Sequence, residues 1–286
     1  MTHPSYPAII EKFSQIKEDP YEVAKHDLLP LGITVEMIPD LIETILDARY
    51  YEDDESIEGY PQLFAYIALG QLKTPAAIDG LILGVKKWSH TDWFEWFCEA
   101  MPDIFGSIGS IAIPALIPVL QDKSLDYDPR TSAAHYLHSI SVTNPDQRDR
   151  CLAAIVDELA QFAENDPQLN GYFVMTLVAD FQAIETAPMI EAAYAADRVA
   201  MEFIGDWEDI QVEFGLIPER LSPKRNYFLG GDYAAEDLAL NRAFARQSNQ
   251  IDSIIEAQKD RSKQANDKNK VKRKQAKESR KKNRRK

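Results

Sequence analysis

The sequence predicts an all-α fold: an α-solenoid of about five helix pairs, followed by a C-terminal capping helix and a disordered basic tail. Three observations support this prediction. A proline-led apolar fragment recurs along the chain, glycine supplies only 12 of the 286 residues, and apolar residues nearly vanish after residue 258. With 45% hydrophobic and 27% charged residues, the chain has the composition of a globular protein that buries a core. The low glycine content argues against a fold rich in tight β-turns and against a Gly-rich phosphate loop.

The repeat is marked by five anchor positions, 36 to 39 residues apart, each followed by an apolar helical pattern. The anchors are Pro39, Pro75, Pro114, Cys151 and Pro188. Proline suits the first turn of a helix because this turn leaves its amide hydrogens unpaired, and because the φ angle of proline is already helical. Another apolar helical run precedes each anchor, so each period holds two helices. Two helices per period are typical of an α-solenoid.

Two glycines mark expected turns inside the helix pairs. Gly70 and Gly109 each lie five residues before the proline of their unit. Glycine readily adopts the left-handed conformation found at helix C-termini. We therefore expect each glycine to end a first helix and to open the turn to the second.

The repeated fragments read Met37–Ile42, Thr74–Ile78, Ile113–Ile117, Arg150–Ile155 and Ala187–Ile190. They resemble HEAT-like repeats, particularly the phycobilisome-lyase HEAT-like group, and the resemblance covers Val35 to Val199. Phe203 to Leu216 resembles the ending of an uncharacterised bacterial HEAT-like family, many members of which carry a C-terminal Cys-rich zinc motif. No cysteine follows Cys151 in this chain, and a tail rich in lysine and arginine stands in place of that motif. The resemblance therefore implies stacked helix pairs without the zinc motif.

Four segments follow from these patterns. Residues 1–216 form the HEAT-like α-solenoid, 217–231 a loop rich in proline and glycine, 232–258 a C-terminal helix that packs on or extends from the solenoid, and 259–286 a disordered Lys/Arg-rich tail. Asp232 suits the cap of the C-terminal helix. The tail has only Val271 and two alanines as apolar residues, too few to offset the entropy lost on ordering.

Charge is unevenly divided along the chain. Residues 259–286 hold 15 Lys/Arg against 3 acids, and residues 1–258 hold 17 against 43, so a body of net −26 carries an arm of net +12. This division excludes a uniformly basic nucleic-acid binder. The candidate anion- or RNA-binding residues of the tail are Lys272, Arg273, Lys274, Arg280, Lys281, Lys282, Arg284, Arg285 and Lys286. Three roles stay open for the tail: contact with RNA or ribosomes, fold-back onto the acidic body, or an aid to solubility alone.

The cysteine content and the first residues favour the cytoplasm. Cys98 and Cys151 belong to no CxxC or Cys/His spacing and are too few for a secreted disulfide scaffold. Residues 1–7 lack the basic and apolar regions of a secretion signal. Ile104 to Gln121 carries no charge but contains two glycines and two prolines. Prolines interrupt a membrane-spanning helix, so we expect a buried helix–turn–helix here and no membrane partner.

Two histidines have the residue type and spacing of a metal site. His135 and His138 share a helix face, but zinc needs three or four ligands and Cys151 is the only tempting third. We therefore expect two helix-packing histidines, and the sequence predicts no metal and no cofactor.

Carboxylates gather near the end of the repeats. Asp206, Asp209 and Glu213 are spaced i, i+3 and i+7, so a helix aligns them on one face beside Trp207. Acid–base catalysis needs a pocket that shifts carboxylate pKa values, and no nucleophile or substrate cradle accompanies these residues. We expect an exposed acidic ridge that caps the solenoid or receives a basic partner, and no catalytic residue.

These features predict a non-enzymatic scaffold or adaptor whose protein partner carries a basic or extended segment. Solenoids build long concave surfaces from their second helices. Those helices carry Glu43, Asp47, Asp79, Asp157, Glu158 and Glu191. Such a surface attracts basic proteins and repels nucleic acid. The candidate partner-binding residues are Asp206, Trp207, Asp209, Glu213, Asp157, Glu158 and Glu191. The resemblance leaves one alternative open, a phycobilin (chromophore) lyase or a lyase accessory protein.

Overall fold

The computed structural model describes residues 8–13, 16, 27–49, 61–89 and 91–224, with the side chains of 8–10 and 92–99 left aside. Every regular element in these ranges is helical and no strand occurs among them, which confirms the all-α prediction. The chain divides into two units, Met1–Ser222 and Pro223–Lys286, and the described helices lie in the first. The predicted C-terminal helix 232–258 and the tail 259–286 lie outside the described residues.

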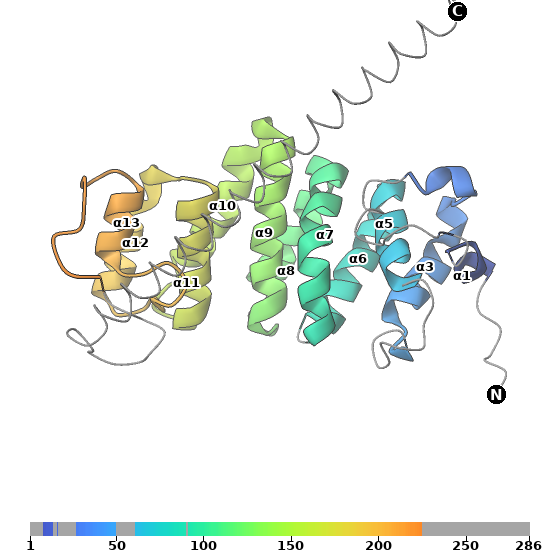
Figure 1. Ribbon diagram of the computed structural model, residues 1–286, viewed down its shortest axis with the longest axis horizontal. Coiled ribbons are helices and arrows are strands. Elements are labelled where there is room, and N and C mark those ends of the chain that lie inside the picture. Colours follow the sequence, from blue (N-terminus) through green and yellow to red (C-terminus); the bar gives the residue numbers. More distant parts are fainter. Residues whose placement is uncertain (1–7, 14–15, 17–26, 50–60, 90, 225–286) are drawn as a thin grey trace, which may run out of the picture. The chain divides into compact units, whose positions relative to one another are not determined.

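The helices of the first unit follow one another along the chain (Figure 1). The α-helices are α1 Ala8–Phe13, α3 Ile38–Leu46, α5 Pro61–Leu72, α6 Pro75–Trp88, α7 Asp92–Ile108, α8 Ile113–Gln121, α9 Tyr127–Thr143, α10 Arg148–Leu159, α11 Pro167–Met175, α12 Ala187–Ala195 and α13 Trp207–Glu213. The 3-10 turns are η1 Leu29–Leu31, η2 Val35–Met37, η3 Gly109–Ala112, η4 Pro145–Gln147 and η6 Ile184–Thr186. A π-helical segment, η5 Thr176–Asp180, continues α11.

The proline prediction is confirmed at four of the five anchors. Helices α3, α6, α8 and α12 have Pro39, Pro75, Pro114 and Pro188 at their first or second positions. The fifth anchor differs, because Cys151 is the fourth residue of α10 and its side chain is buried. In that unit Pro145 opens the turn η4, which leads directly into α10. We call α3, α6, α8, α10 and α12 the proline-led helices.

Contacts between helices follow an alternating order. The proline-led helices contact one another in sequence from α3 to α6, α8 and α10, while α5, α7, α9 and α11 form a second series in the same way. The most extensive contact of all joins α7 to α9, which lie side by side in Figure 1. The buried apolar residues form one continuous core between the two series. At its centre the rings of Phe105 and Tyr136 stack, with centroids 4.6 Å apart and planes 16° from parallel.

The two glycines expected in turns have different roles. Gly109 has a φ of +82° and caps α7, which confirms the prediction. The prediction for Gly70 is wrong, because α5 continues to Leu72 and Lys73 takes the left-handed conformation with a φ of +50°. Gly70 instead lies where a Cβ atom would come 2.4 Å from a methyl group of Ile104. Its missing side chain allows α5 and α7 to pack closely.

One apolar stretch, Ala100–Gln121, has the length and the mean hydropathy, 1.8, of a membrane-crossing helix. The chain turns within it at Gly109, so it forms the end of α7, the turn η3 and α8. More than half of its window, 56%, is buried inside the molecule. The expected helix–turn–helix is therefore present, although Pro118 lies inside α8 and does not end it.

Candidate functional site

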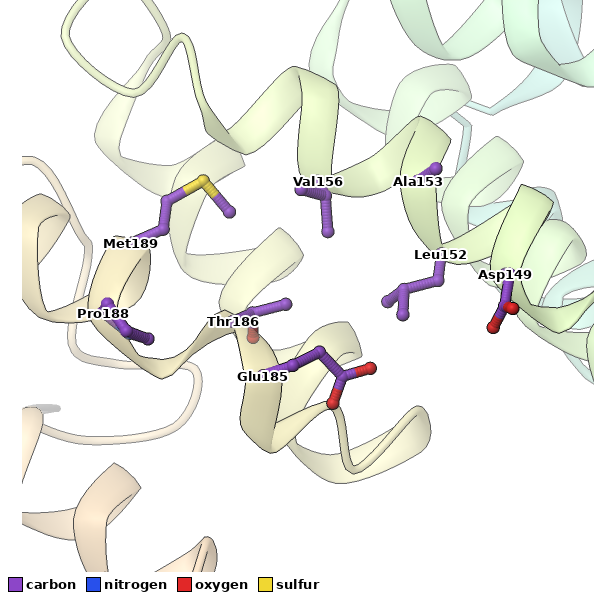
Figure 2. A pocket seen from close by; sticks show the side chains of 8 residues that line it. All are labelled: Asp149, Leu152, Ala153, Val156, Glu185, Thr186, Pro188 and Met189. Carbon is purple, nitrogen blue, oxygen red and sulfur yellow. The ribbon is translucent and has the colours of Figure 1, made fainter.

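An apolar groove lies between α10 and α12 and encloses about 380 Å³. Its lining residues are Asp149, Leu152, Ala153, Val156, Glu185, Thr186, Pro188 and Met189. Figure 2 shows Met189 reaching from α12 toward Val156 on α10, while Asp149 and Glu185 lie farther along the groove, away from that pair. The groove therefore has an apolar floor and an acidic end.

The groove lies where the direct contacts between successive proline-led helices become less extensive. Helices α8 and α10 contact each other directly, whereas α10 and α12 have no comparably extensive contact. Between α10 and α12 the chain passes through α11, the π-helical segment η5 and the turn η6. π-Helical segments are rare and occur frequently at functional sites. Here the segment lies in the connection between α11 and α12.

The α10 wall of the groove is one face of that helix. Asp149, Leu152, Ala153 and Val156 are spaced i, i+3, i+4 and i+7, so they form a single stripe. Leu152 is buried, whereas Ala153 is exposed and Val156 is half-buried. Such a stripe normally packs against another helix, and in this position it faces the groove.

The acidic end of the groove is partly neutralised by Arg148. Its Nη1 atom lies 3.5 Å from a carboxylate oxygen of Glu185 and 3.8 Å from one of Asp149. Its Nη2 atom donates a hydrogen bond of 3.0 Å to the carbonyl oxygen of Phe181, and its guanidinium lies 5.9 Å from the centre of that ring. The side chain of Asp149 is 99% exposed and that of Glu185 is 54% exposed.

Most acids predicted on the proline-led helices are exposed. Glu43, Asp79, Asp157 and Glu191 are exposed and have no ion-pair partner among the residues described. Asp47 differs, because it accepts a hydrogen bond of 2.9 Å from Nε of Arg49. This bond is the main reason that the pKa of the Asp47 carboxyl is lowered. Asp157 and Glu191 lie on the two helices that form the groove.

Glu158 is not on the surface where we expected it. Its side chain is 3% exposed and accepts a hydrogen bond of 2.7 Å from Nη2 of Arg130, which is also buried. Nε of Arg130 donates to the carbonyl oxygen of Leu120, so the pair ties α9 to the ends of α8 and α10. Buried carboxylates are kept charged by such partners. Glu158 is therefore a structural residue of the core and is withdrawn as a candidate partner-binding residue.

The predicted acidic ridge near α13 does not form. Asp206 precedes α13 and caps it, and its side chain and that of Asp209 accept from each other's backbone amides at 3.1 Å. Arg220 then pairs with Asp206 through two hydrogen bonds, of 2.7 and 2.9 Å, and lies 2.7 Å from Asp209. These carboxylates raise the pKa of Arg220 further above its ordinary value. Two of the three ridge carboxylates are thus neutralised inside the chain.

The other residues of the expected ridge lie apart from that cluster. Trp207 packs against the core, with its ring centroid 6.3 Å from that of Tyr194. Glu213 is exposed at the end of α13. The sequence correctly indicated a helix here but missed Arg220, because the arginine follows the helix and returns to its first turn.

His138 packs against a neighbouring aromatic ring, and Cys151 lies in the core. The His138 ring meets the Phe181 ring at 5.0 Å, and burial lowers the pKa of His138. Cys151 is fully buried, and burial raises the pKa of its thiol to about 11. A thiol in that state is protonated at neutral pH and is a poor nucleophile. Within the described part of the chain, no three His, Cys, Asp or Glu side chains are placed to hold a metal ion.

The tail residues Lys272, Arg273, Lys274, Arg280, Lys281, Lys282, Arg284, Arg285 and Lys286 lie outside the described residues. Comparisons with family models, curated proteins and solved structures each returned no match to this chain.

Proposed function

We propose that this protein is a non-enzymatic interaction scaffold, built as an α-solenoid of HEAT-like helix pairs, that binds a basic segment of a partner protein. The observation that supports this function best is the groove between α10 and α12, with its apolar floor and its exposed carboxylates. The helix-pair architecture is supported by the prolines at the helix starts and by the two alternating series of helices.

The floor of the groove supplies the attraction for an apolar side chain. Its apolar residues come from both walls: Leu152, Ala153 and Val156 from α10, with Pro188 and Met189 from α12. Burying one leucine or methionine side chain contributes about 1.5–3 kcal/mol. A volume of about 380 Å³ accommodates a few side chains of a peptide rather than a folded domain.

The carboxylates around the groove determine which peptides approach. Asp149 and Glu185 lie at one end, and Asp157 and Glu191 are exposed on the same two helices. Each exposed ion pair contributes only about 0.2–1 kcal/mol, so charge adds less affinity than apolar burial. Its larger effect is on the association rate and on the rejection of acidic partners, and both effects weaken as salt is added.

Replacing Ala153 with tryptophan tests this function. Ala153 is exposed and lines the groove, so the larger side chain fills the groove while the core stays intact. We expect affinity for a labelled peptide with leucines flanked by basic residues to fall about tenfold or more, measured by fluorescence anisotropy. The matched control is Ala76→Trp, an exposed alanine in the first turn of α6. Equal affinity in both variants and the unmodified chain would show that the groove is not the binding site.

We further propose that the basic tail contacts RNA through phosphate groups. The proposal rests on its charge, 15 Lys/Arg against 3 acids in residues 259–286. Phosphate contacts are independent of base sequence and weaken steeply with salt. The acidic body, net −26 in residues 1–258, competes with RNA for the same charges at high effective concentration.

Three proteins compared in parallel separate RNA binding by the tail from competition by the acidic body. We expect weak RNA binding by the full-length protein, stronger binding by a peptide of residues 259–286, and none by residues 1–258. The measurement is a titration of labelled RNA across a salt series. RNA binding by residues 1–258, or an affinity that ignores salt, would exclude the tail as the contact. Equal affinity of tail and full-length protein would exclude competition by the acidic body alone.

A further inference from the structure

We propose that the groove recognises an arginine next to a long aliphatic residue of the partner, and that Arg148 opposes this recognition as an internal competitor. The inference rests on the proposed function and specifies the chemistry of the segment bound. It derives from the acidic end of the groove, where two carboxylates and one guanidinium lie together.

The carboxylates of Asp149 and Glu185 keep their capacity to accept hydrogen bonds. Nη1 of Arg148 lies 3.8 and 3.5 Å from them, within ion-pair range but at or beyond the limit of a hydrogen bond. Within the described residues, neither carboxylate accepts a hydrogen bond from a side chain. Both remain accessible to a donor from another molecule, since their side chains are 99% and 54% exposed.

Contacts other than those with the two carboxylates hold Arg148 at the acidic end of the groove. Its hydrogen bond goes to the carbonyl oxygen of Phe181, directly after the π-helical segment, and its guanidinium lies over the Phe181 ring. The side chain is 37% exposed. Its charge therefore stays beside the two carboxylates even though it makes no close bond with either. A cation arriving there meets two attractive charges and one repulsive charge.

An arginine suits these acceptors better than a lysine. The planar guanidinium has five N–H donors and can bond two carboxylate oxygens at once, whereas the lysine ammonium is a point charge that is more strongly hydrated. The apolar floor begins at Leu152, one helical turn from Asp149. An aliphatic residue adjacent to the arginine can therefore enter the groove while the guanidinium bonds the acidic end.

The test compares Arg148→Ala with Arg148→Lys and Arg150→Ala in the full-length protein. Arg148→Ala removes the repulsive charge, and Arg148→Lys keeps it. Arg150 is exposed on α10 but does not line the groove, so Arg150→Ala makes the same change in net charge elsewhere. The probes are labelled peptides with a central leucine flanked by arginines, by lysines or by citrullines, titrated by fluorescence anisotropy at two salt concentrations.

We expect Arg148→Ala to bind the arginine peptide about threefold to tenfold more tightly than the unmodified chain, with a steeper dependence on salt. Arg148→Lys and Arg150→Ala should change affinity by less than about twofold, and the arginine peptide should bind more tightly than the lysine and citrulline peptides. Because Arg148 also contacts Phe181, Asp149→Asn and Glu185→Gln provide a second test at exposed residues. Each should weaken the arginine peptide about twofold to fivefold.

Two outcomes would overturn this inference while leaving the proposed function in place. One is unchanged or weaker binding in a folded Arg148→Ala variant whose groove still responds to Ala153→Trp. The other is equal affinity for the arginine and lysine peptides. If the protein self-associates and the arginine peptide disrupts this association, the groove binds a second copy of this chain. That result would overturn the proposal that the groove binds a segment of another protein.

Discussion

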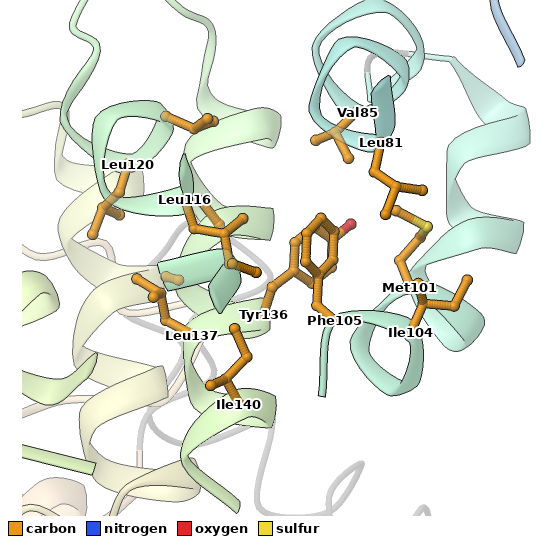
Figure 3. Packing of buried hydrophobic residues seen from close by; sticks show 14 of the residues in the cluster. Leu81, Val85, Met101, Ile104, Phe105, Leu116, Leu120, Tyr136, Leu137 and Ile140 are labelled. Carbon is orange, nitrogen blue, oxygen red and sulfur yellow. The ribbon is translucent and has the colours of Figure 1, made fainter. Parts of the chain in front are cut away.

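Replacing Leu116 with aspartate is expected to destabilise the helical body by at least about 4 kcal/mol, a large part of the stability of an ordinary domain. Leu116 is 1% exposed on α8 and lies near Phe105 and Tyr136 in the centre of the core (Figure 3). An aspartate there loses the apolar contacts and buries a charge that has no partner. Helix α8 itself contains no charged residue that could pair with the new carboxylate.

The measurement for Leu116→Asp is urea denaturation followed by far-ultraviolet circular dichroism. The matched control is Ile111→Asp, because Ile111 is 52% exposed in the turn just before α8. We expect this control to change the free energy of unfolding by less than about 1 kcal/mol. A loss in Leu116→Asp no larger than in the control would contradict the burial of α8.

Replacing Glu158 with alanine is expected to cost about 3–5 kcal/mol of stability, because it leaves Arg130 charged and buried without its carboxylate. The two side chains are 3% and 8% exposed and are joined by a hydrogen bond of 2.7 Å. Arg130 keeps its bond to the carbonyl oxygen of Leu120, which cannot neutralise the charge. An exposed carboxylate on the same helix, Asp157, is the control and should cost less than about 1 kcal/mol when replaced by alanine.

A double variant separates the effect of losing the ion pair from the effect of leaving one buried charge without a partner. Arg130→Met together with Glu158→Leu removes both charges and keeps apolar volume in place. We expect it to recover most of the stability lost in Glu158→Ala, since a buried ion pair is often replaced by apolar residues at little cost. If chemical denaturation gave Glu158→Ala a loss below about 1 kcal/mol, Glu158 would be a surface residue after all.

The starts of the helices could be predicted from the sequence because they depend on local chemistry. Proline lacks an amide hydrogen and has a helical φ angle, and these properties act within one turn. Pro39, Pro75, Pro114 and Pro188 therefore mark α3, α6, α8 and α12 correctly. Gly70 shows the limit of this reasoning, because close packing against Ile104 requires its missing side chain, and that contact lies far along the chain.

The charged residues were harder to place, since their roles depend on partners distant in sequence. Glu158 pairs with Arg130, 28 residues away, and Asp206 pairs with Arg220, 14 residues away. No pattern within a single helix reveals either pair. Asp157, next to Glu158 in the sequence, is exposed.

The groove shows the same division between local and distant information. The spacing of Asp149, Leu152, Ala153 and Val156 is visible in the sequence as one face of a helix. Such a stripe usually packs against its neighbour in the next repeat. The sequence does not show that α12 contacts α10 too little to cover the stripe, because this separation depends on the path of the chain through η5 and η6.

Photo-cross-linking tests most directly whether the groove binds a basic segment. The probe is the arginine-flanked peptide with photoleucine at its centre, mixed with the unmodified full-length protein and mapped by mass spectrometry. We expect cross-links at Leu152, Val156 or Met189, on the two walls of the groove, and their loss when excess unlabelled peptide is added. Cross-links spread over the other proline-led helices, or concentrated on α3 and α6, would contradict a binding site between α10 and α12.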